Sequence, residues 1–387
     1  MNKLITIAAA AAAAMITVKI LNPIRAYAWG GSSHDVITGF ALDSFENQKK
    51  TQMIAFYKRY RRQLCEGSKA PDLEGDVDKG SGLHYYSSLD LKGKPLPQKG
   101  GYFRNRHGKY FKSARTCLED NYTSALNLYK SGRTEEAMFV LGRAAHFVED
   151  IACPPHSTSQ PYAEKNDNMH YMFEQYADKT SKKYPPVGFD KRHINSYSDY
   201  SFENPANRLS NASGKFAPQI ASLDESAFDK AQKALVPLAA ENVMALLMKF
   251  HGDCHEENGN YIKDGSTVSL RCEGSGMMLT YTTKGGVALA KLDHAKEQRF
   301  TVVMNDNGSF ALRAADGNFL SADLKKFVKP AEDGKGSAIR AAAVGRSIFR
   351  LSVGENFTKV MTGSRSSASA EDFAPGSSAQ CWIITSV

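Results

Sequence analysis

The sequence His146-Phe-Val-Glu-Asp150 is followed by Ile-Ala-Cys-Pro-Pro-His156 and, fourteen residues later, by His170-Tyr-Met-Phe-Glu174. In each outer pair a histidine precedes an acid by four residues, so on a helix both side chains lie on one face. Imidazole nitrogen and carboxylate oxygen, without a thiolate, suit zinc in a catalytic site. The two prolines should end the first helix and place His156 on a rigid turn. We therefore expect a metal site where two helices and this turn meet.

Residues 1–28 have the features of a secretory signal peptide. Lys3 precedes an apolar run over 4–18, and small residues before position 29 provide a cleavage site. A membrane anchor is the alternative, but this run is shorter than the roughly 20 residues that a spanning helix needs. We expect cleavage after Ala28, which makes Trp29 the first mature residue and delivers the protein to the periplasm or the medium.

This pattern resembles the bacterial zinc-dependent phospholipase C family, which is related to the single-strand-specific zinc nucleases of fungi and plants. The chain shares a mature N-terminal Trp, an early His, a Pro-Asp with His twelve residues on, and two His–acid pairs around a further His. The resemblance covers about residues 29–250. It implies a mainly helical domain that holds three zinc ions.

The resemblance also implies which residues bind each ion. Grouped by ion, they are Asp72, His84, His146 and Asp150; His156, His170 and Glu174; and Trp29 (through its free amine and carbonyl), His34 and Asp150, whose carboxylate bridges two ions. The same resemblance gives Asp72 a catalytic role as a general base. Glu149 stands where the family commonly has glycine. Its helical position points it away from the metal face, so we expect no role for it.

Three features distinguish the two branches of this superfamily. The spacing Trp29-Gly-Gly-Ser-Ser-His34 is that of the nucleases, whereas Glu174 and the short interval from His156 to His170 are those of the phospholipases. We therefore predict a secreted phospholipase C that cleaves the glycerol-side phosphodiester of phospholipids to diacylglycerol and a phosphorylated head group. One alternative is an extracellular zinc nuclease that acts on nucleic acid and releases 5′-nucleotides. Another is a metal-stabilised carbohydrate- or membrane-binding protein.

The segment from Asp72 to His84 bears on the lipid head group. Leu73 follows the aspartate and Ser81 precedes the histidine by three residues, so no aromatic cage for a quaternary ammonium is evident there. We expect a broad or non-choline preference.

Length, net charge and cysteine content limit the possible domain number, binding partners and disulfides. A chain of 387 residues can build two domains with full cores. Its net charge of +8 would favour anionic lipid or nucleic acid, but it does not separate the two. Six cysteines in an exported protein predict disulfides, with fifteen pairings open if all six are bonded. We favour Cys272–Cys381, and we expect Cys153 to form a bridge rather than to bind metal.

Residues 52–248 have the apolar spacing of helices joined by polar loops. We expect helices over 114–129, 134–151 and 237–250, the last with Pro237 at its first position. A loop over 67–101 should carry Asp72 and His84, and residues 182–220 should form a long surface excursion.

Beyond residue 254 the chain changes to short β-type runs. The segment Val268-Ser-Leu-Arg271 is repeated as Phe310-Ala-Leu-Arg313, and a third copy begins near Phe357. The expected strands are 267–270, 300–304, 310–313, 348–353, 357–361 and 381–384. Each unit should close with an aromatic strand, at Phe300, Phe349 and Trp382.

Three such units resemble a β-trefoil, with a β-sandwich as the alternative. We therefore expect a helical catalytic domain over 29–254 and an all-β domain over 260–387 that binds carbohydrate, protein or membrane. Because every predicted ligand precedes residue 254, we expect the second domain to be separable from the first.

Overall fold

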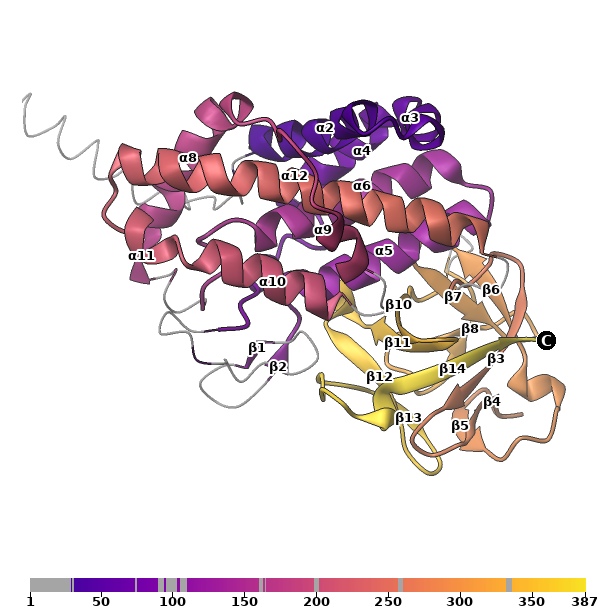
Figure 1. The fold of residues 1–387 in the computed structure, drawn as a ribbon. Helices are drawn as coiled ribbons and strands as arrows, with labels where there is room; N and C mark the ends of the chain where they lie inside the picture. Colours follow the sequence, from indigo (N-terminus) through magenta and orange to yellow (C-terminus); the bar gives the residue numbers. More distant parts are fainter. Residues whose placement is uncertain are drawn as a thin grey trace, which may run out of the picture.

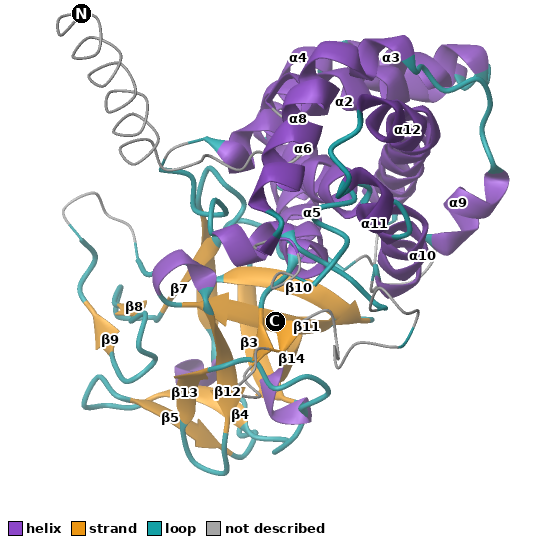
Figure 2. Cartoon of the chain, turned by 90° about the vertical axis from the view of Figure 1, so that its left-hand side faces the viewer, coloured by secondary structure: helices purple, strands orange, loops and turns teal. Residues whose placement is uncertain are grey.

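The computed structural model describes residues 29, 31–73, 75–89, 94, 103–104, 110–159, 163, 165–197, 202–256, 260–331 and 336–387. Helices make up most of the first part of the chain and antiparallel strands the second, and the two parts lie side by side (Figure 1). Figure 2 shows the same division from the side. The predicted fold class, a mainly helical domain followed by an all-β domain, is confirmed. The predicted signal peptide lies outside the described residues.

The helical part contains two short strands and several 3-10 turns besides its helices. The α-helices are α2 (Gly31–Asn47), α3 (Thr51–Lys58), α4 (Arg61–Lys69), α5 (Ala114–Lys130), α6 (Thr134–Ile151), α8 (Asp167–Thr180), α9 (Lys191–Ser196), α10 (Glu203–Gly214), α11 (Ala217–Ile220) and α12 (Glu225–His255). The 3-10 turns are η1 (Ala70–Asp72), η2 (Ser81–His84) and η3 (Ser181–Lys183), and the strands are β1 (Phe103–Arg104) and β2 (Tyr110–Phe111). The helices predicted over 114–129 and 134–151 are confirmed as α5 and α6.

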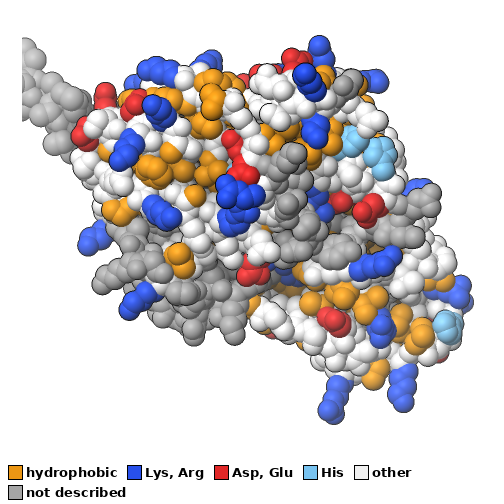
Figure 3. Space-filling view, viewed as in Figure 1, with side chains coloured by type: hydrophobic (Ala, Val, Ile, Leu, Met, Phe, Trp, Pro, Cys, Tyr) orange, Lys and Arg blue, Asp and Glu red, His pale blue; other side chains and the backbone are white. Residues whose placement is uncertain are grey.

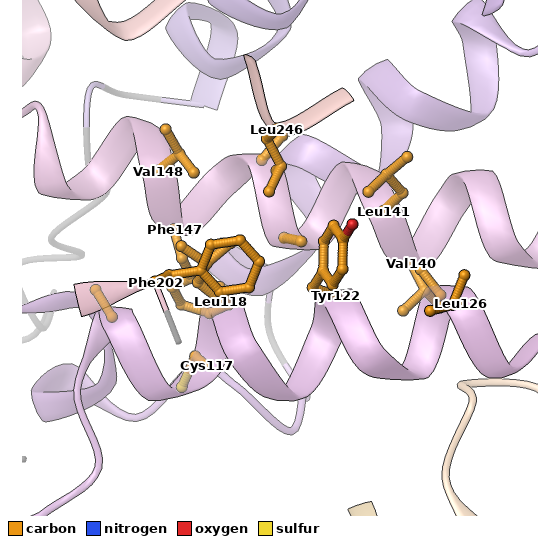
Figure 4. Packing of buried hydrophobic residues seen from close by; sticks show 14 of the residues in the cluster. Cys117, Leu118, Tyr122, Leu126, Val140, Leu141, Phe147, Val148, Phe202 and Leu246 are labelled. Atoms are coloured by element: carbon orange, nitrogen blue, oxygen red, sulfur yellow. The ribbon is translucent and has the colours of Figure 1, made fainter. Parts of the chain in front are cut away.

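Helix α6 runs through the core of the helical part. Between Ala137 and Ile151 every residue except Phe139 is buried. Figure 4 shows its apolar side chains meeting those of α5, with Phe202 and Leu246 packed nearby. A helix buried all round has no solvent face, so each polar side chain near its end must find a partner inside the protein.

Two predictions about this part of the chain are wrong. Pro237 lies inside α12 rather than at its start. The helix tolerates it because the carbonyl that loses its donor belongs to Lys233, which is exposed and can bind water instead. Residues 182–220 include α9, α10 and α11 rather than forming one long excursion. Helix α10 buries residues at helical spacing, among them Ala206 and Leu209.

Helices α4 and α6 cross in close contact through two glycines. A Cβ atom at Gly142 would lie 2.2 Å from the Leu64 carbonyl oxygen, and one at Gly67 would lie 2.0 Å from the Phe139 carbonyl oxygen. Only glycine permits this approach. The crossing fixes α4, and therefore η1 with Asp72, against α6.

The second part of the chain is built from short antiparallel strands. They are β3 (Thr267–Cys272), β4 (Met278–Tyr281), β5 (Val287–Ala290), β6 (Phe300–Met304), β7 (Phe310–Arg313), β8 (Phe319–Leu320), β9 (Phe327–Val328), β10 (Arg340–Gly345), β11 (Ile348–Val353), β12 (Lys359–Gly363), β13 (Ala368–Glu371) and β14 (Cys381–Ser386). Among them β4–β5, β8–β9 and β12–β13 form hairpins.

The remaining strands of the described residues close into a ring. Pairing runs β3–β6, β6–β7, β10–β11, β11–β14 and β14–β3. A bridge between Phe310 and Ile339 joins β7 to the start of β10 and completes the circuit. A barrel ring with one hairpin in each third of the chain is a β-trefoil, so the trefoil prediction is confirmed over the sandwich. A closed ring also leaves no barrel edge open to pairing with another chain.

The boundaries of the repeats differ from the sequence prediction. Leu270, Leu312 and Leu351 occupy equivalent places, because they stand opposite residues of β14, β6 and β10. The third unit therefore begins with β11, and Phe349 opens it instead of closing the second. The second unit closes with the alanine-rich β10, which lacks an aromatic residue and lies against α5; the Ala343 N–H donates to the Thr123 hydroxyl there.

The disulfide predictions are wrong. All six cysteines, each within the described part of the chain, are free thiols. Trp382 stands directly opposite Cys272 on the paired strands β14 and β3. Neighbouring residues of a strand point to opposite faces. The side chain of Cys381 therefore points away from that of Cys272, and Cys153 is a buried thiol rather than half of a bridge.

We expect Gly142→Ala to destabilise the protein by about 1–3 kcal/mol, because the new methyl group must displace α4. Denaturant unfolding of the full chain measures this change. Gly252→Ala is the matched control: Gly252 is also helical, but a Cβ there has no neighbour within 4 Å, so this variant should be neutral or slightly more stable. Equal stability of the two variants would contradict the close crossing.

Candidate metal centre

Eight of the nine predicted ligands bring their side chains together in two neighbouring clusters. They come from α2, from the turns η1 and η2, from α6 and the turn that follows it, and from α8. The first cluster consists of His34, Asp72, His84, His146 and Asp150; the second cluster consists of His156, His170 and Glu174. All eight side chains are buried.

Asp150 lies at the middle of the first cluster. Its Oδ2 is 2.8 Å from His84 Nδ1 and 3.1 Å from His146 Nε2. Its Oδ1 faces the other way, 3.8 Å from His34 Nε2. Asp72 approaches from η1, with Oδ2 3.6 Å from His34 Nε2 and Oδ1 3.9 Å from His84 Nδ1. The two oxygens of Asp150 therefore face two different groups of nitrogen donors, as a bridging carboxylate requires.

The second cluster is built on α8. Its i, i+4 pair shares one face as predicted, with His170 Nε2 2.5 Å from Glu174 Oε1. His156 Nε2 completes the group, 3.2 Å from Glu174 Oε1 and 3.0 Å from His170 Nε2. The clusters are connected through His84, whose backbone carbonyl lies 3.1 Å from His156 Nδ1. Helix α6 ends at Ile151, so the turn that follows carries His156, as predicted.

Backbone carbonyls fix the orientation of three of these rings. Ser68 O lies 2.7 Å from His146 Nδ1, Asp78 O lies 3.1 Å from His84 Nε2, and His84 O faces His156 Nδ1. A carbonyl can only accept, so each of these nitrogens carries the hydrogen. When the ring is neutral, the opposite nitrogen has the lone pair and faces the cluster, so a metal ion bound there would take the place of a proton. This is the arrangement in which protein partners prepare histidines to bind metal.

Three buried atoms of the first cluster have no hydrogen-bond partner among the described residues. They are His34 Nε2, Asp72 Oδ2 and Asp150 Oδ1, and they converge on one another. Buried polar atoms are costly unless they are satisfied. A divalent cation would satisfy all three, and the donor set of imidazole and carboxylate suits zinc. The residues present therefore fit the expected metal.

The local field is negative enough to favour a cation. Burial alone would lower the pKa of His84, but the carboxylates of Asp150 and Asp72 outweigh it and raise that pKa to about 9. Burial likewise opposes the charged form of Asp150, yet the neighbouring His146 and His84 hold its pKa well below the usual value. The charges around the first cluster and the geometry of its donor atoms therefore both favour a bound cation.

The expectation that Glu149 has no role is wrong. Its Oε2 lies 2.5 Å from His34 Nδ1, and its Oε1 accepts from the Thr38 hydroxyl at 2.7 Å. Glu149 points away from the predicted ligands His146 and Asp150, as helical spacing indicated. Helix α2, rather than solvent, lies on the face of α6 that carries Glu149. The signal that could have identified this role is the apolar run around it: a helix with no polar face must pair a glutamate internally.

Trp29 is placed next to these residues. Its side chain is fully buried, and its indole N–H donates to the Glu149 carbonyl at 2.6 Å. Its ring packs against Phe173 of α8 at 5.7 Å between centroids. The first predicted mature residue is thus anchored between α6 and α8 through its side chain.

Comparison with known proteins gives one family. The family model described as zinc dependent phospholipase C matches residues 33–226, half of the chain and the part that holds both clusters. No curated protein matches the chain.

Several solved structures are similar to it. Alpha-toxin of an avian strain of Clostridium perfringens shares 15% identity and a TM-score of 0.47 over 89% of this chain and 98% of the toxin. Alpha toxin of Clostridium absonum shares 14% identity and a TM-score of 0.45 over 95% and 98% of the two chains. The designed threefold-symmetric protein ThreeFoil shares 16% identity and a TM-score of 0.28 over 32% of this chain and all of its own.

We expect Glu149→Gln to weaken zinc retention by about 10- to 100-fold, because a carboxylate partner holds the His34 ring and increases its basicity. Titration of the zinc-loaded protein with a chelator measures this effect. The control is Glu136→Gln, which removes a partly exposed acid in the first turn of the same helix. Wild-type retention in both variants would show that Glu149 does not support His34.

Proposed function

Because the chain belongs to the zinc-dependent phospholipase C family, we propose that it is a hydrolase that cleaves the glycerol-side phosphodiester of phospholipids. The products would be diacylglycerol and a phosphorylated head group. Membership of the family supports zinc as the metal and phospholipid as the substrate class. The observation that carries the proposal is the pair of adjacent buried clusters, in which histidine nitrogens and carboxylate oxygens converge from α2, η1, η2, α6 with the turn after it, and α8.

We further propose that the centre holds three zinc ions. The proposed ligands are Asp72, His84, His146 and Asp150; His156, His170 and Glu174; and Trp29, His34 and Asp150. The opposed oxygens of Asp150 support its bridging role. Bound zinc would supply activated water and positive charge for the phosphate oxygens.

The protein's own residues would position this chemistry. Asp72 is the proposed general base as well as a metal ligand; the family resemblance supports this role, and the carboxylate faces the first cluster. Backbone carbonyls hold His84, His146 and His156 in the tautomer that exposes a lone pair to the metals. Burial of all these groups excludes bulk water, which strengthens their interaction with a developing charge.

A zinc nuclease releasing 5′-nucleotides is the second candidate. The interval from Trp29 to His34 favours it, whereas Glu174 and the interval from His156 to His170 favour the phospholipase. On the described part of the face in Figure 3, Lys and Arg side chains are interspersed with acidic and neutral ones and do not gather in one basic surface. A nucleic-acid groove normally has such a surface. A purely metal-stabilised binding protein is less consistent with so many converging donors, because structural zinc sites are closed by four ligands.

The boundaries and location of the protein are part of the same proposal. Residues 29–254 would form the catalytic domain and residues 260–387 a domain that binds carbohydrate, protein or membrane. After cleavage behind Ala28 the protein would be periplasmic or secreted. Its substrate would then be a membrane surface outside the cytoplasm.

One assay separates the two enzymatic readings. Purified mature protein is offered vesicles of phosphatidylcholine, phosphatidylethanolamine or anionic lipid, and in parallel single-stranded DNA or RNA, each with and without a chelator. We expect chelator-sensitive release of diacylglycerol from more than one lipid and little nucleotide release. Rapid nucleotide release without lipid cleavage would favour the nuclease, and strict choline selectivity would contradict the expected head-group preference.

A second experiment concerns the new N-terminus. If the amine of Trp29 binds the third zinc ion, one additional N-terminal residue converts that amine to an amide, which has no available lone pair. We expect the extended protein to fold, to contain one zinc ion fewer than protein beginning at Trp29, and to lose most of its activity. Elemental analysis and the lipid assay measure both effects.

The precursor would then be inactive before export. Full activity and an unchanged zinc content in the extended protein would remove Trp29 from the ligand set. His34 and Asp150 would in that case need another partner at the third ion.

A further inference from the structure

A buried network of charges lies where the trefoil meets the helical part. The trefoil contributes Arg340 from β10 and Arg350 from β11. Arg340 pairs with Asp78 in the segment between η1 and η2, whereas Arg350 pairs with Glu119 and Asp120 on α5. Both arginines are buried, at 1% and 7% exposure. Removing one partner from such a pair withdraws compensation from a charge that stays buried, so single substitutions in these pairs are costly.

Asp78 is the point at which this network reaches the metal centre. Its Oδ2 accepts from Arg143 at 2.8 Å and from Asn121 at 3.0 Å, whereas its Oδ1 accepts from Arg340 at 2.7 Å. Burial would raise the pKa of Asp78, but Arg340 and Arg143 outweigh it and hold that pKa far below its usual value. The carboxylate is therefore ionised and held on both oxygens.

The backbone of the same residue holds a metal ligand. The carbonyl oxygen of Asp78 lies 3.1 Å from His84 Nε2, and this contact turns His84 Nδ1 toward Asp150 and Asp72. Asp78 thus contacts Arg340 through its side chain and His84 through its backbone carbonyl. If losing Arg340 shifts the backbone of Asp78 together with its side chain, the carbonyl that orients the ring moves with it.

We propose that Arg340 of the trefoil is a positioning residue for the metal centre, acting through Asp78 on His84. This inference rests on the proposed role of His84 as a zinc ligand. The hydrogen bond from Arg340 Nη1 goes to Asp78, whereas its Nε and Nη2 atoms have no hydrogen-bond partner among the described residues. Its guanidinium lies 4.5 Å from the centre of the Phe357 ring. Packing against Phe357 therefore holds the guanidinium in place, and the hydrogen bond to Asp78 orients it toward the segment that precedes His84.

The proposal changes the expected relation between the two domains. A trefoil attached only for targeting would leave the catalytic centre complete without it. Here its removal would take Arg340 from Asp78 and Arg350 from Glu119. Asp78 would keep Arg143 and Asn121, and Glu119 would keep Arg115, but one oxygen of Asp78 would lose the partner that holds it. On this proposal the helical part alone would fold but would retain zinc less well than the full chain.

The test compares Arg340→Met with Arg350→Met in the full mature chain. Both changes remove a buried trefoil arginine from an ion pair with the helical part, so both should lower stability. Only the first touches the segment that holds His84. We expect Arg340→Met to lose zinc to a chelator at about 10- to 100-fold lower chelator concentration than wild type. Arg350→Met should retain zinc as wild type does, once both proteins are shown by near-UV circular dichroism to be folded.

Arg340→Lys keeps the charge without the planar fork and covers the case in which Arg340→Met does not fold. We expect it to fold and to retain zinc more weakly than wild type but more strongly than any folded Arg340→Met. In the lipid assay the Arg340 variants should lower kcat more than they raise KM, since His84 belongs to the metal centre and not to a remote lipid contact.

The outcomes separate this inference from the function on which it rests. If the wild-type protein retains no zinc, the proposed metal set fails. If wild type binds zinc but the folded Arg340 variants retain it as well as Arg350→Met does, the positioning role of Arg340 is wrong while the metal centre stands. Zinc retention is measured without substrate, so neither conclusion depends on the lipid assay.

Discussion

The rest of the structure depends on the burial of α6, where every residue from Ala137 to Ile151 except Phe139 has little or no contact with solvent. This helix carries His146, Glu149 and Asp150 in its last turns, and none of them has access to water. A buried charge must be neutralised, paired or bound to metal. Helix α2 supplies His34 to Glu149, α4 supplies the Ser68 carbonyl to His146, and η2 supplies His84 to Asp150. The packing of these elements around α6 therefore also builds the first cluster.

The glycine crossing shows how packing and chemistry are joined. Gly67 and Gly142 bring α4 within backbone contact of α6, and the end of α4 then supplies the Ser68 carbonyl that orients His146. The 3-10 turn that follows delivers Asp72 to the same place. A site built on helix ends held this closely keeps its donors in position without relying on long, mobile side chains.

Close packing also joins the trefoil to the helical part. Its alanine-rich strand β10 allows close approach to α5, and this approach places Arg340 beside Asp78. By the strand register, Phe300 of β6 and Trp382 of β14 correspond to Ile339, just before β10, so all three repeats place a large apolar residue there. Where β6 has Val302 and β14 has Ile384, β10 has Ala341, and this smaller strand is the one that lies against α5.

The sequence by itself determined the helices α5 and α6, the change to a β-trefoil and the eight side chains that converge at the centre, because these follow from local spacing and from family resemblance. It did not determine the role of Glu149, the free state of Cys272 and Cys381, or the pairing of Arg340 with Asp78. Those depend on which surface lies opposite a residue: α2 behind Glu149, Trp382 across from Cys272, and α5 beneath β10. Periodicity indicates which way a side chain points along its own element, but only the tertiary structure decides what it meets there.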